Sequence, residues 1–423
     1  MTDNLIDSYL KYTAESESPA IFHRWSIITC IAAYLSRDIH IQHGHFTIYP
    51  NLYTLLIGSA GSRKSSAINI AKGLLKQSGY NHFSPTKTTK EKFFIDMAES
   101  NGTGSGNAED FLEQTIFGSK EDDPNSVSEM FIVAGEFNTF FGNNILDFVT
   151  DLGELWDYNG RFESKVKNSK SVQIMNPTIN ILGGNTPTGF SAAFPIEILG
   201  QGFFSRTIMI YGERTRAKIT WPEPPDEQHT LELLTHIREI KLHAINAGRI
   251  TITSSAKDLL DVIYKSWKDL DDARFESYSN RRFTHLLKLC MLTAAIRMST
   301  SITPEDVVYA NTVLSYAEHF MPKALGEFGK AKHADVAHKV LQILETYQGV
   351  VSVLELWKFV HNDLDKIGEL GTILENLVRA EKIQTVTGGF LPKRKAIRDV
   401  DTGLMNKVVN FNLLSHEEKE SLI

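Results

Sequence analysis

The chain has 423 residues, of which 42% are apolar and 22% are charged, so it can bury two or three compact cores and is not a disordered polymer. A net charge of −7 excludes a bulk polycation and leaves only a local surface for nucleic acid. The two cysteines, Cys30 and Cys290, are far apart and lack metal-ligand neighbours, which excludes a disulfide scaffold and a zinc module.

The N-terminal residues 1–8 are polar and acidic, unlike a signal peptide, and the apolar stretch 25–35 is too short to span a bilayer. We therefore expect a cytoplasmic protein without a membrane partner. The spacing of apolar residues predicts a helix over 6–36, and the alternation in 38–49 predicts a hairpin. Together they predict a helical and hairpin region, 1–50, packed on the core that follows.

A buried parallel strand is predicted at 52–57, because this nearly continuous apolar run ends at a glycine, and a helix is predicted at 65–77. Further strands are predicted at 130–133, 174–182 and 207–211. Strands that alternate with helices are typical of an α/β fold. We therefore expect an α/β core over 51–225, with a parallel sheet covered on both faces.

The second half of the chain is predicted to be mostly helical. A proline cluster at 221–225 ends the core, and the pattern of 226–330 predicts a helical lid. Residues 331–400 contain three short helical segments and then two short strands, which is the order of a winged-helix domain. Residues 401–423 are assigned to a C-terminal tail.

The segment 58–65 reads Gly-Ser-Ala-Gly-Ser-Arg-Lys-Ser, which matches the phosphate-loop pattern G-x-x-x-x-G-K-[ST] except that Arg63 replaces the second glycine. In such a loop, backbone N–H groups and the helix N-terminus bind phosphate oxygens. Lys64 is expected to reach the β- and γ-phosphates of ATP, and the Ser65 hydroxyl to ligate Mg²⁺. The alternative is a glycine-rich turn with a chance lysine. The expected nucleotide-binding residues of the loop are Gly58, Ser59, Ala60, Gly61, Ser62, Arg63, Lys64, Ser65 and Ser66.

Two polar residues follow predicted strands and are candidates for ATP hydrolysis, which needs a carboxylate to orient water and a group that senses the γ-phosphate. Glu136 follows the strand 130–133 and is expected to act as the base and to contribute to the metal site. The aspartate that usually precedes such a glutamate is replaced by Gly135. Asn185 follows the third strand and is a candidate sensor. The alternatives are an exposed loop glutamate and a turn asparagine.

Arginines after the sensor complete the predicted catalytic set. Arg206 precedes the fourth strand and is expected to reach the γ-phosphate of a neighbouring subunit as a finger, the alternative being a surface salt bridge. Arg281 and Arg282 begin an apolar helix, and we assign Arg282 as a nucleotide-binding second sensor. The alternative is an arginine that faces solvent at a helix N-terminus.

A basic cluster lies between the glutamate strand and the asparagine strand. Lys165, Lys167 and Lys170 are expected to contact the phosphate backbone of single-stranded DNA without reading its sequence, the alternative being a solvated basic loop. The predicted winged unit ends in a second basic run, 393–395. That run suits phosphate contact, although winged helices also dock proteins.

With these residues in view, the chain resembles a family of phage- and plasmid-encoded P-loop ATPases that are described as replicative helicases or as the helicase part of primase-helicases. The resemblance covers about residues 18 to 400. It rests on the segments Ser-Pro-Ala-Ile-Phe-His-Arg-Trp (18–25), Pro-Asn-Leu-Tyr (50–53), the loop 58–66, Gly135-Glu136-Phe137, Leu155-Trp156-Asp157-Tyr158, Asn176-Pro177, Gly184-Asn185-Thr186-Pro187, 202–206 and 281–289.

The order of loop, glutamate, asparagine, arginine, helical lid and winged helix also resembles AAA+ and superfamily III ring helicases. The resemblance implies an AAA+/RecA-like P-loop NTPase core and gives Lys64, Ser65, Glu136, Asn185 and Arg206 the roles argued above. In such rings, an insertion at the place of the three lysines projects into the central pore. The implied activity is an ATP-dependent DNA helicase or translocase in the replication of a phage or plasmid, in the host cytoplasm.

The implied partners are single-stranded or forked DNA, five further copies in a homo-hexamer, and a primase or polymerase of the same replicon. Two alternatives stay open. An ATP-switched helicase loader is mildly favoured by the departures at Arg63 and Gly135. The other is an ATPase that senses or remodels protein, as in phage defence, without unwinding.

Overall fold

A computed structural model describes most of the chain. The described residues are 5–100, 126–141, 145–164, 172–194, 198–199, 201–215, 218–270, 272–326, 334–347, 350–364, 366–379 and 383–392. A boundary after Gly326 divides them into two compact units. The regions expected at 1–50, 51–225 and 226–330 pack together in the first unit.

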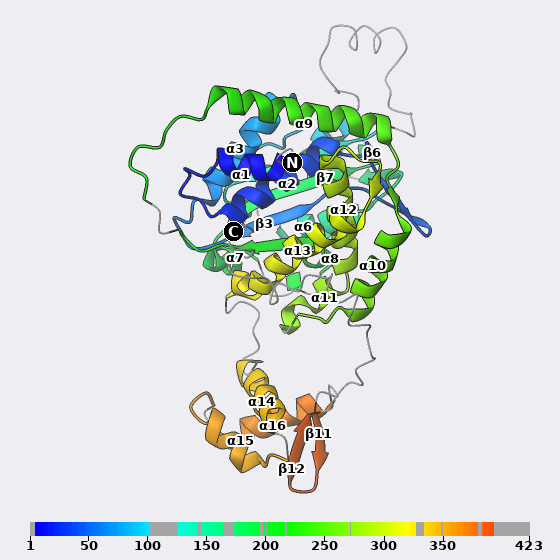
Figure 1. Ribbon diagram of the computed structural model, residues 1–423. Helices are drawn as coiled ribbons and strands as arrows, with labels where there is room; N and C mark the ends of the chain where they lie inside the picture. The colour runs from blue at the N-terminus through cyan, green and yellow to red at the C-terminus, as the bar shows by residue number, and fades with distance from the viewer. Residues whose placement is uncertain are drawn as a thin grey trace, which may run out of the picture. The chain divides into compact units, whose positions relative to one another are not determined.

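The first unit is built on a four-stranded parallel sheet in the order β4-β7-β3-β8 (Figure 1). The strands are β3 (Tyr53–Ile57), β4 (Glu129–Ala134), β7 (Thr178–Asn185) and β8 (Thr207–Tyr211). Every residue of β3 and β7 is buried, which is why β3 appears in the sequence as a continuous apolar run. Beyond β4, Phe83 adds a single parallel bridge to Phe131. The prediction of an α/β fold with a parallel sheet is confirmed.

The strand predicted at 174–182 is wrong in its bounds, because the chain is interrupted there. Ile174 belongs to β6 (Val172–Met175), which pairs antiparallel with β5 (Arg161–Ser164) outside the main sheet. Asn176 has a left-handed backbone (φ 41°) and Pro177 follows it, so the extended chain stops before β7 begins. The strand β7, which follows this break and belongs to the main sheet, ends at Asn185.

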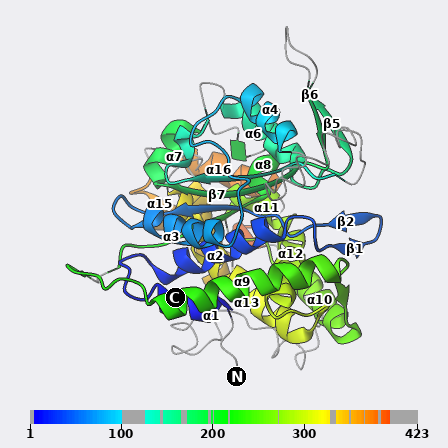
Figure 2. The same ribbon diagram turned by 90° about the horizontal axis from the view of Figure 1, so that it is seen from above.

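Helices cover both faces of the sheet (Figure 2). One face is covered by α2 (Ala20–Leu35) and α3 (Lys64–Gln77), which pack against each other and against β7. The helix predicted at 6–36 is divided into α1 (Leu5–Tyr12) and α2, because Pro19 stands at the N-cap of α2. The helix α2 is buried on nearly all sides, since it lies between the sheet and the helices α1, α3 and α9.

The first unit contains further elements, of which α9 packs over α1, α2 and α3. These further elements are β1 (Ile41–His43), β2 (Phe46–Ile48), α4 (Lys90–Glu99), η2 (Phe137–Thr139), α6 (Ile145–Leu155), α7 (Pro187–Ala193), α8 (Gly202–Ser205), α9 (Glu227–Ala247), β9 (Thr251–Ile252), α10 (Ser254–Ser266), η4 (Ala273–Phe275), α11 (Glu276–Ser279), α12 (Arg282–Ile296), β10 (Ser301–Ile302) and α13 (Pro304–Leu325). The predicted hairpin within 38–49 is β1 and β2, and the described residues of the region 226–330, which end at Gly326, are mostly helical, as predicted.

The second unit contains three helices and an antiparallel hairpin in the predicted order. The elements are α14 (Ala334–Thr346), α15 (Val353–Val360), α16 (Ile367–Arg379), β11 (Ile383–Val386) and β12 (Gly389–Pro392). Its own core includes Val340, Leu356 and Leu370. Among the described residues of the chain, no helix combines the length and apolarity that crossing a bilayer requires.

Candidate functional site

The loop 58–63 joins the carboxyl end of β3 to the start of α3, as the phosphate-loop pattern predicts. Two of its residues are left-handed, Gly61 (φ 79°) and Arg63 (φ 60°). A non-glycine residue in this conformation costs about 1–2 kcal/mol, which explains why the pattern has glycine at the place of Arg63. Outside the loop, the Arg63 guanidinium binds the Glu17 carboxylate, with its Nε 2.8 Å from Oε2.

Glycine at position 58 lets the backbone of the loop lie against the end of β8. A Cβ on Gly58 would stand 2.4 Å from the Gly212 carbonyl oxygen and 2.8 Å from Ser62 Oγ. A Cβ on Gly212 would stand 2.6 Å from the ring of Phe22 on α2. The base of the loop is therefore a close contact of β3, β8 and α2, with no room for side chains at the two glycines.

The Lys64 ammonium points back into the loop. Its Nζ donates to the Gly58 carbonyl at 2.8 Å, the Ser59 carbonyl at 3.0 Å and Ser62 Oγ at 3.2 Å. Burial lowers the pKa of Lys64, and the nearby Glu136 carboxylate opposes this shift. The amine therefore lies at the phosphate-binding hollow of the loop, held by neutral acceptors that an anionic phosphate oxygen would outcompete.

The short distance between Gly135 and Ser65 explains why glycine, and not aspartate, precedes Glu136. A Cβ on Gly135 would stand 3.0 Å from Ser65 Oγ, so a side chain at this position would crowd the hydroxyl. Glu136 is exposed and is the first carboxylate after the strand. The hydroxyl of Ser65, the ammonium of Lys64 and the carboxylate of Glu136 thus gather at the carboxyl edge of the sheet.

Asn185 ends β7, the strand between β3 and β4. It is fully buried, its carbonyl accepts the Gly58 N–H at 3.2 Å, and its Oδ1 accepts the Thr186 N–H at 2.9 Å. Its Nδ2 has no partner among the described residues. A buried donor without a partner costs about 1–3 kcal/mol. Within the described part of the chain, this amide is a buried donor that the acceptor of a ligand could satisfy.

Arg206 lies at the opposite edge of the sheet. The register pairs Tyr53 with Thr207 and Ile57 with Tyr211, so Arg206 precedes the start of β8 while the loop follows the end of β3. Five residues of strand separate the two, roughly 16 Å. Arg206 Nη1 donates to the Gly202 carbonyl at 2.7 Å, and its Nε has no partner among the described residues. An arginine side chain is too short to reach its own loop from there.

A buried lysine near Arg206 was not found by sequence reasoning. Lys288 on α12 donates to the Tyr49 carbonyl at 2.9 Å, to Asn51 Oδ1 at 2.7 Å and to Asp157 Oδ1 at 3.0 Å. Its Nζ also lies 4.1 Å from the centre of the Trp156 ring, over which the Arg206 guanidinium stands at 5.9 Å. The family resemblance included Lys288 in the segment 281–289 and its partner Asp157 in 155–158, but it gave the lysine no role.

The assignment of Arg282 as a nucleotide sensor is contradicted by its contacts. Arg282 is buried, with Nε 3.0 Å from the Glu318 carboxylate and Nη2 2.8 Å from Asn311 Oδ1. Its guanidinium also stacks 3.5 Å from the centre of the Trp267 ring. These contacts join α12 to α13 and occupy the guanidinium, so Arg282 is neither a sensor nor solvent-facing. Its neighbour Arg281 is only half-buried and lowers the pKa of Arg206, after the larger effect of burial.

The predicted DNA-binding residues Lys165, Lys167 and Lys170 fall outside the described residues, as does the basic run 393–395. The described part of the chain also contains no group of three or more histidine, cysteine or acidic residues that could hold a metal ion.

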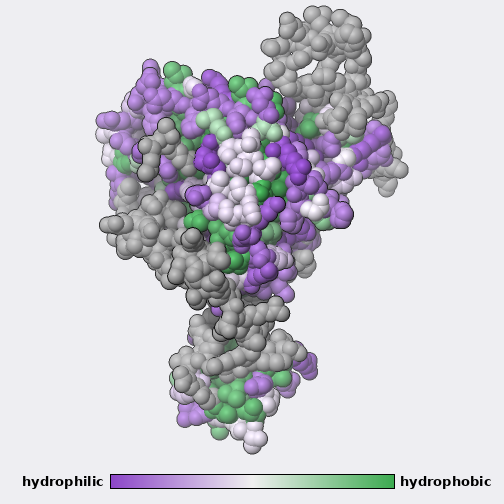
Figure 3. Space-filling view, turned by 45° about the vertical axis from the view of Figure 1, so that its right-hand side comes forward, coloured by the Kyte–Doolittle hydropathy of each residue, from purple (hydrophilic) through white to green (hydrophobic). Residues whose placement is uncertain are grey.

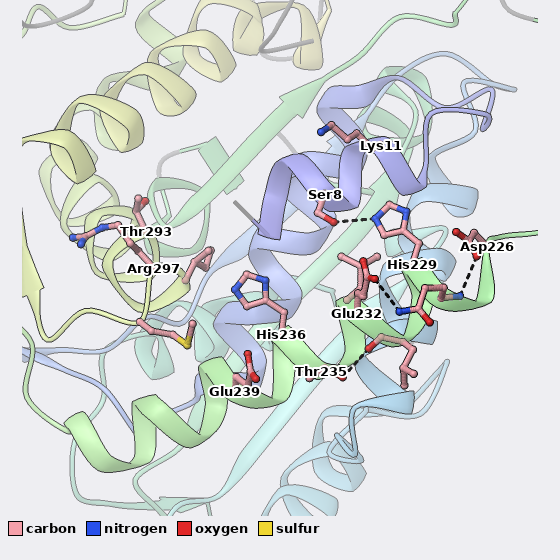
Figure 4. Close-up of a pocket in the computed structure, with 15 residues that line it drawn as sticks. Ser8, Lys11, Asp226, His229, Glu232, Thr235, His236, Glu239, Thr293 and Arg297 are labelled. Atoms are coloured by element: carbon pink, nitrogen blue, oxygen red, sulfur yellow. Dashed lines mark hydrogen bonds between the residues drawn. The ribbon is translucent and has the colours of Figure 1, made fainter. Parts of the chain in front are cut away.

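Among the hollows of the described part of the first unit are two that are wide enough to hold a small ligand. The larger one, about 1020 Å³, is the α9 hollow: it is formed by α1, α9 and the end of α12, and no residue of the phosphate loop borders it (Figure 4). In it, Ser8 Oγ and His229 Nε2 are 2.9 Å apart. The second, about 530 Å³, is bordered by Arg63 and Ser66 and is called the loop-side hollow below.

Comparison with known proteins gives no family and no relative, because no protein-family model and no curated protein matches the chain.

Proposed function

We propose that this chain is a P-loop ATPase of the AAA+/RecA-like kind, which binds Mg-ATP on the loop Gly58–Ser66 and acts as a homo-oligomeric DNA helicase or translocase. The observation that carries the proposal is the gathering of Lys64, Ser65, Glu136 and the unpaired amide of Asn185 at the carboxyl edge of β3, β4 and β7. Ligands of open parallel sheets bind at this edge.

In this proposal, the phosphates lie on the N-terminus of α3, where backbone N–H groups and the helix dipole favour negative charge. Lys64 exchanges its loop carbonyls for the β- and γ-phosphate oxygens. The Ser65 hydroxyl and the Glu136 carboxylate are hard oxygen ligands and fit Mg²⁺, which keeps several waters and needs few protein groups. When bound, Mg²⁺ neutralises charge on the phosphates.

Hydrolysis in this proposal depends on two side chains beside the γ-phosphate. Glu136 accepts a hydrogen bond from the attacking water and orients it. Asn185 donates through Nδ2, the atom left without a partner, either to that water or to a γ-phosphate oxygen. Arg206 completes the site from a neighbouring subunit, since its distance from its own loop excludes a role in the same subunit.

The experiment that tests the proposal is ATP turnover with and without single-stranded DNA, for the wild type and for a Lys165/Lys167/Lys170→Ala variant. We expect turnover that DNA stimulates in the wild type but not in the variant, and Lys64→Ala should abolish turnover altogether. Absence of turnover in the wild type would contradict the ATPase proposal. Turnover that DNA leaves unchanged would contradict the helicase proposal and would favour the alternative below.

A loader or protein-remodelling ATPase is the second candidate, and the surface of the second unit favours it. The exposed side chains of α16 include Thr372, Glu375, Asn376 and Arg379, so a single arginine stands beside neutral and acidic residues and does not form a basic surface for DNA. On α15 and beside it, exposed apolar residues gather instead, with Leu354 67% and Phe359 51% exposed (Figure 3). Such a surface suits protein better than phosphate. Stimulation of turnover by a protein and not by DNA would establish this function.

A further inference from the structure

The loop-side hollow begins where the phosphates of a bound nucleotide would end. Arg63 and Ser66 border it and flank Lys64 and Ser65 in the sequence. Its volume of about 530 Å³ lies in the range of 300–1,000 Å³ that small-ligand sites occupy. Of the two hollows, the loop-side hollow is the one bordered by a residue of the phosphate loop. The larger α9 hollow has no loop residue in its wall.

From this end, the hollow follows one face of α3. Ser66, Asn69, Ile70, Gly73 and Gln77 all line it, at the spacing of three and four residues that places side chains on one helix face. The helix rises about 10 Å between Ser66 and Gly73. That length matches a ribose and a base extending from an α-phosphate at Ser66.

Gly73 has no explanation in the fold itself. Glycine in a helix interior costs about 1 kcal/mol relative to alanine. At Gly58 a Cβ would collide with neighbouring atoms, but a Cβ on Gly73 would meet no described atom within 4 Å apart from its chain neighbours and the backbone of its own helix. Its backbone also lacks the positive φ that favours glycine. The missing side chain therefore only enlarges the hollow.

The opposite wall is held in place by hydrogen bonds to Glu17. The Ile219 N–H donates to Glu17 Oε1 at 3.0 Å, and Thr215 Oγ1 donates to the Glu17 carbonyl at 2.7 Å. Ile219 and Pro222 thus face α3 across the hollow, with Tyr12 beside them. The Tyr12 ring is fixed against the rings of its neighbours, 6.4 Å and 5.5 Å away between centres.

The hollow is lined by apolar side chains, by two amides and by the carboxylates of Glu15, Glu17 and Glu223, a mixture that suits a flat heterocycle and the hydroxyl groups of its ribose. Ile70 and the open face of Gly73 form one wall, and Ile219 and Pro222 form the other. The side-chain amides of Asn69 and Gln77 supply both donors and acceptors, which the edge of a nucleobase requires. Neither amide has a hydrogen-bond partner among the described residues, so both are available.

We propose that the loop-side hollow is the nucleoside subsite, in which the ribose and base of the bound nucleotide lie over Gly73 between α3 and the segment 219–225. This inference rests on the proposed function, since it takes the phosphates to be bound at Lys64 and Ser65. It adds that the base, and not the phosphates alone, contributes to affinity.

The test compares Mg-ATP with Mg-tripolyphosphate in calorimetric titrations of the full chain. The Gly73→Leu side chain fills the hollow, so affinity for ATP should fall at least about tenfold, which corresponds to 1.4 kcal/mol. Affinity for tripolyphosphate should stay unchanged, because the loop is untouched. The fold should be retained, since leucine favours a helix more than glycine. Gly73→Ala should give a smaller loss.

The matched control is Thr235→Leu, which places the same side chain at an exposed position lining the α9 hollow. It should leave both affinities unchanged. Wild-type binding of tripolyphosphate as tight as that of ATP would overturn the nucleoside subsite and leave the phosphate site standing. Equal affinity of Gly73→Leu and wild type for ATP, or an equal loss for both ligands, would also overturn it. No binding of either ligand by the wild type would overturn the proposed function and this inference with it.

Discussion

At the scale of single residues, the departures from the phosphate-loop motif have local causes. Arg63 adopts the left-handed conformation that the motif reserves for glycine, and its side chain leaves the loop to bind Glu17. Hydrogen bonds from Ile219 N–H and then from Arg63 lower the pKa of Glu17, so this carboxylate stays charged at neutral pH. Gly135 stands so close to Ser65 that an aspartate there would displace the hydroxyl.

The unpaired amide of Asn185 leads to a prediction about turnover. Asn185→Ala removes a donor directed at the reacting water or γ-phosphate, so kcat should fall by about 10²-fold, as for other single hydrogen-bond donors. The affinity for ATP should change little, because the amide contributes mainly after the phosphates are bound. The measurement is steady-state turnover beside equilibrium binding of Mg-ATP. A variant with wild-type kcat would remove Asn185 from the catalytic set.

At the scale of elements, the sequence was most informative where local pattern and packing agree. The buried strand β3, the glycines after it and the helix α3 were predictable, because an apolar run, a motif and a helical periodicity all point to the same arrangement. The division of the N-terminal helix at Pro19 and of the third strand at Asn176 was missed, although each break has a residue that explains it.

Long-range pairing set the limit of prediction for the site. Arg282 looked like a free arginine at a helix start, but Glu318, distant in the sequence, neutralises it inside the helical layer. No role was predicted for Lys288, whose ammonium is buried against Asp157 and Asn51. No local sequence pattern indicates such a partner, because ion pairs between distant segments depend on the fold.

The buried side chain of His285 on α12 leads to a prediction about how the stability of the fold depends on pH. His285 is fully buried, and burial lowers its pKa from 6.5 to about 3. Between these values the unfolded chain binds a proton that the folded chain does not. His285 therefore contributes stability above pH 6.5 that is lost as pH falls towards 3. From pH 6.5 to pH 5 the loss is about 2 kcal/mol.

The measurement is the free energy of unfolding in urea at several pH values, for the wild type and for His285→Gln. The variant should be less stable near neutral pH but should lose less stability on acidification. His23, whose pKa burial lowers to about 4, acts in the same direction in both proteins and cancels in the comparison. Parallel curves for the two proteins would contradict this account of His285.

At the scale of the whole molecule, the two halves of the proposed active site lie on opposite edges of one sheet. The loop follows the end of β3, and Arg206 precedes the start of β8, which pairs with β3 in parallel. Under the proposed function, a subunit alone would carry the groups that bind the phosphates but would lack the arginine that completes catalysis. The second unit, with its own core, adds a separate surface to each subunit.

Mixing two inactive variants tests this arrangement. Lys64→Ala lacks the loop lysine and Arg206→Ala lacks the finger, so each alone should have no turnover. In an equimolar mixture, roughly a quarter of the subunit contacts join an intact loop to an intact arginine, and turnover should return to about that fraction. Turnover in Arg206→Ala alone, or none in the mixture, would contradict a site shared between subunits.

The position of Arg206 also bears on the symmetry of an assembly. If the loop of one subunit meets the arginine of the next through two separate patches, as in a ring, the contact between subunits is head-to-tail. Head-to-tail contacts continue until they close on themselves or grow into a filament. Every subunit in such a ring faces the same way round, so the ring has two different faces. A DNA strand that passed through such a ring would meet the two faces in a fixed order. That order follows from the positions of the loop and of Arg206 at opposite ends of the β-strands.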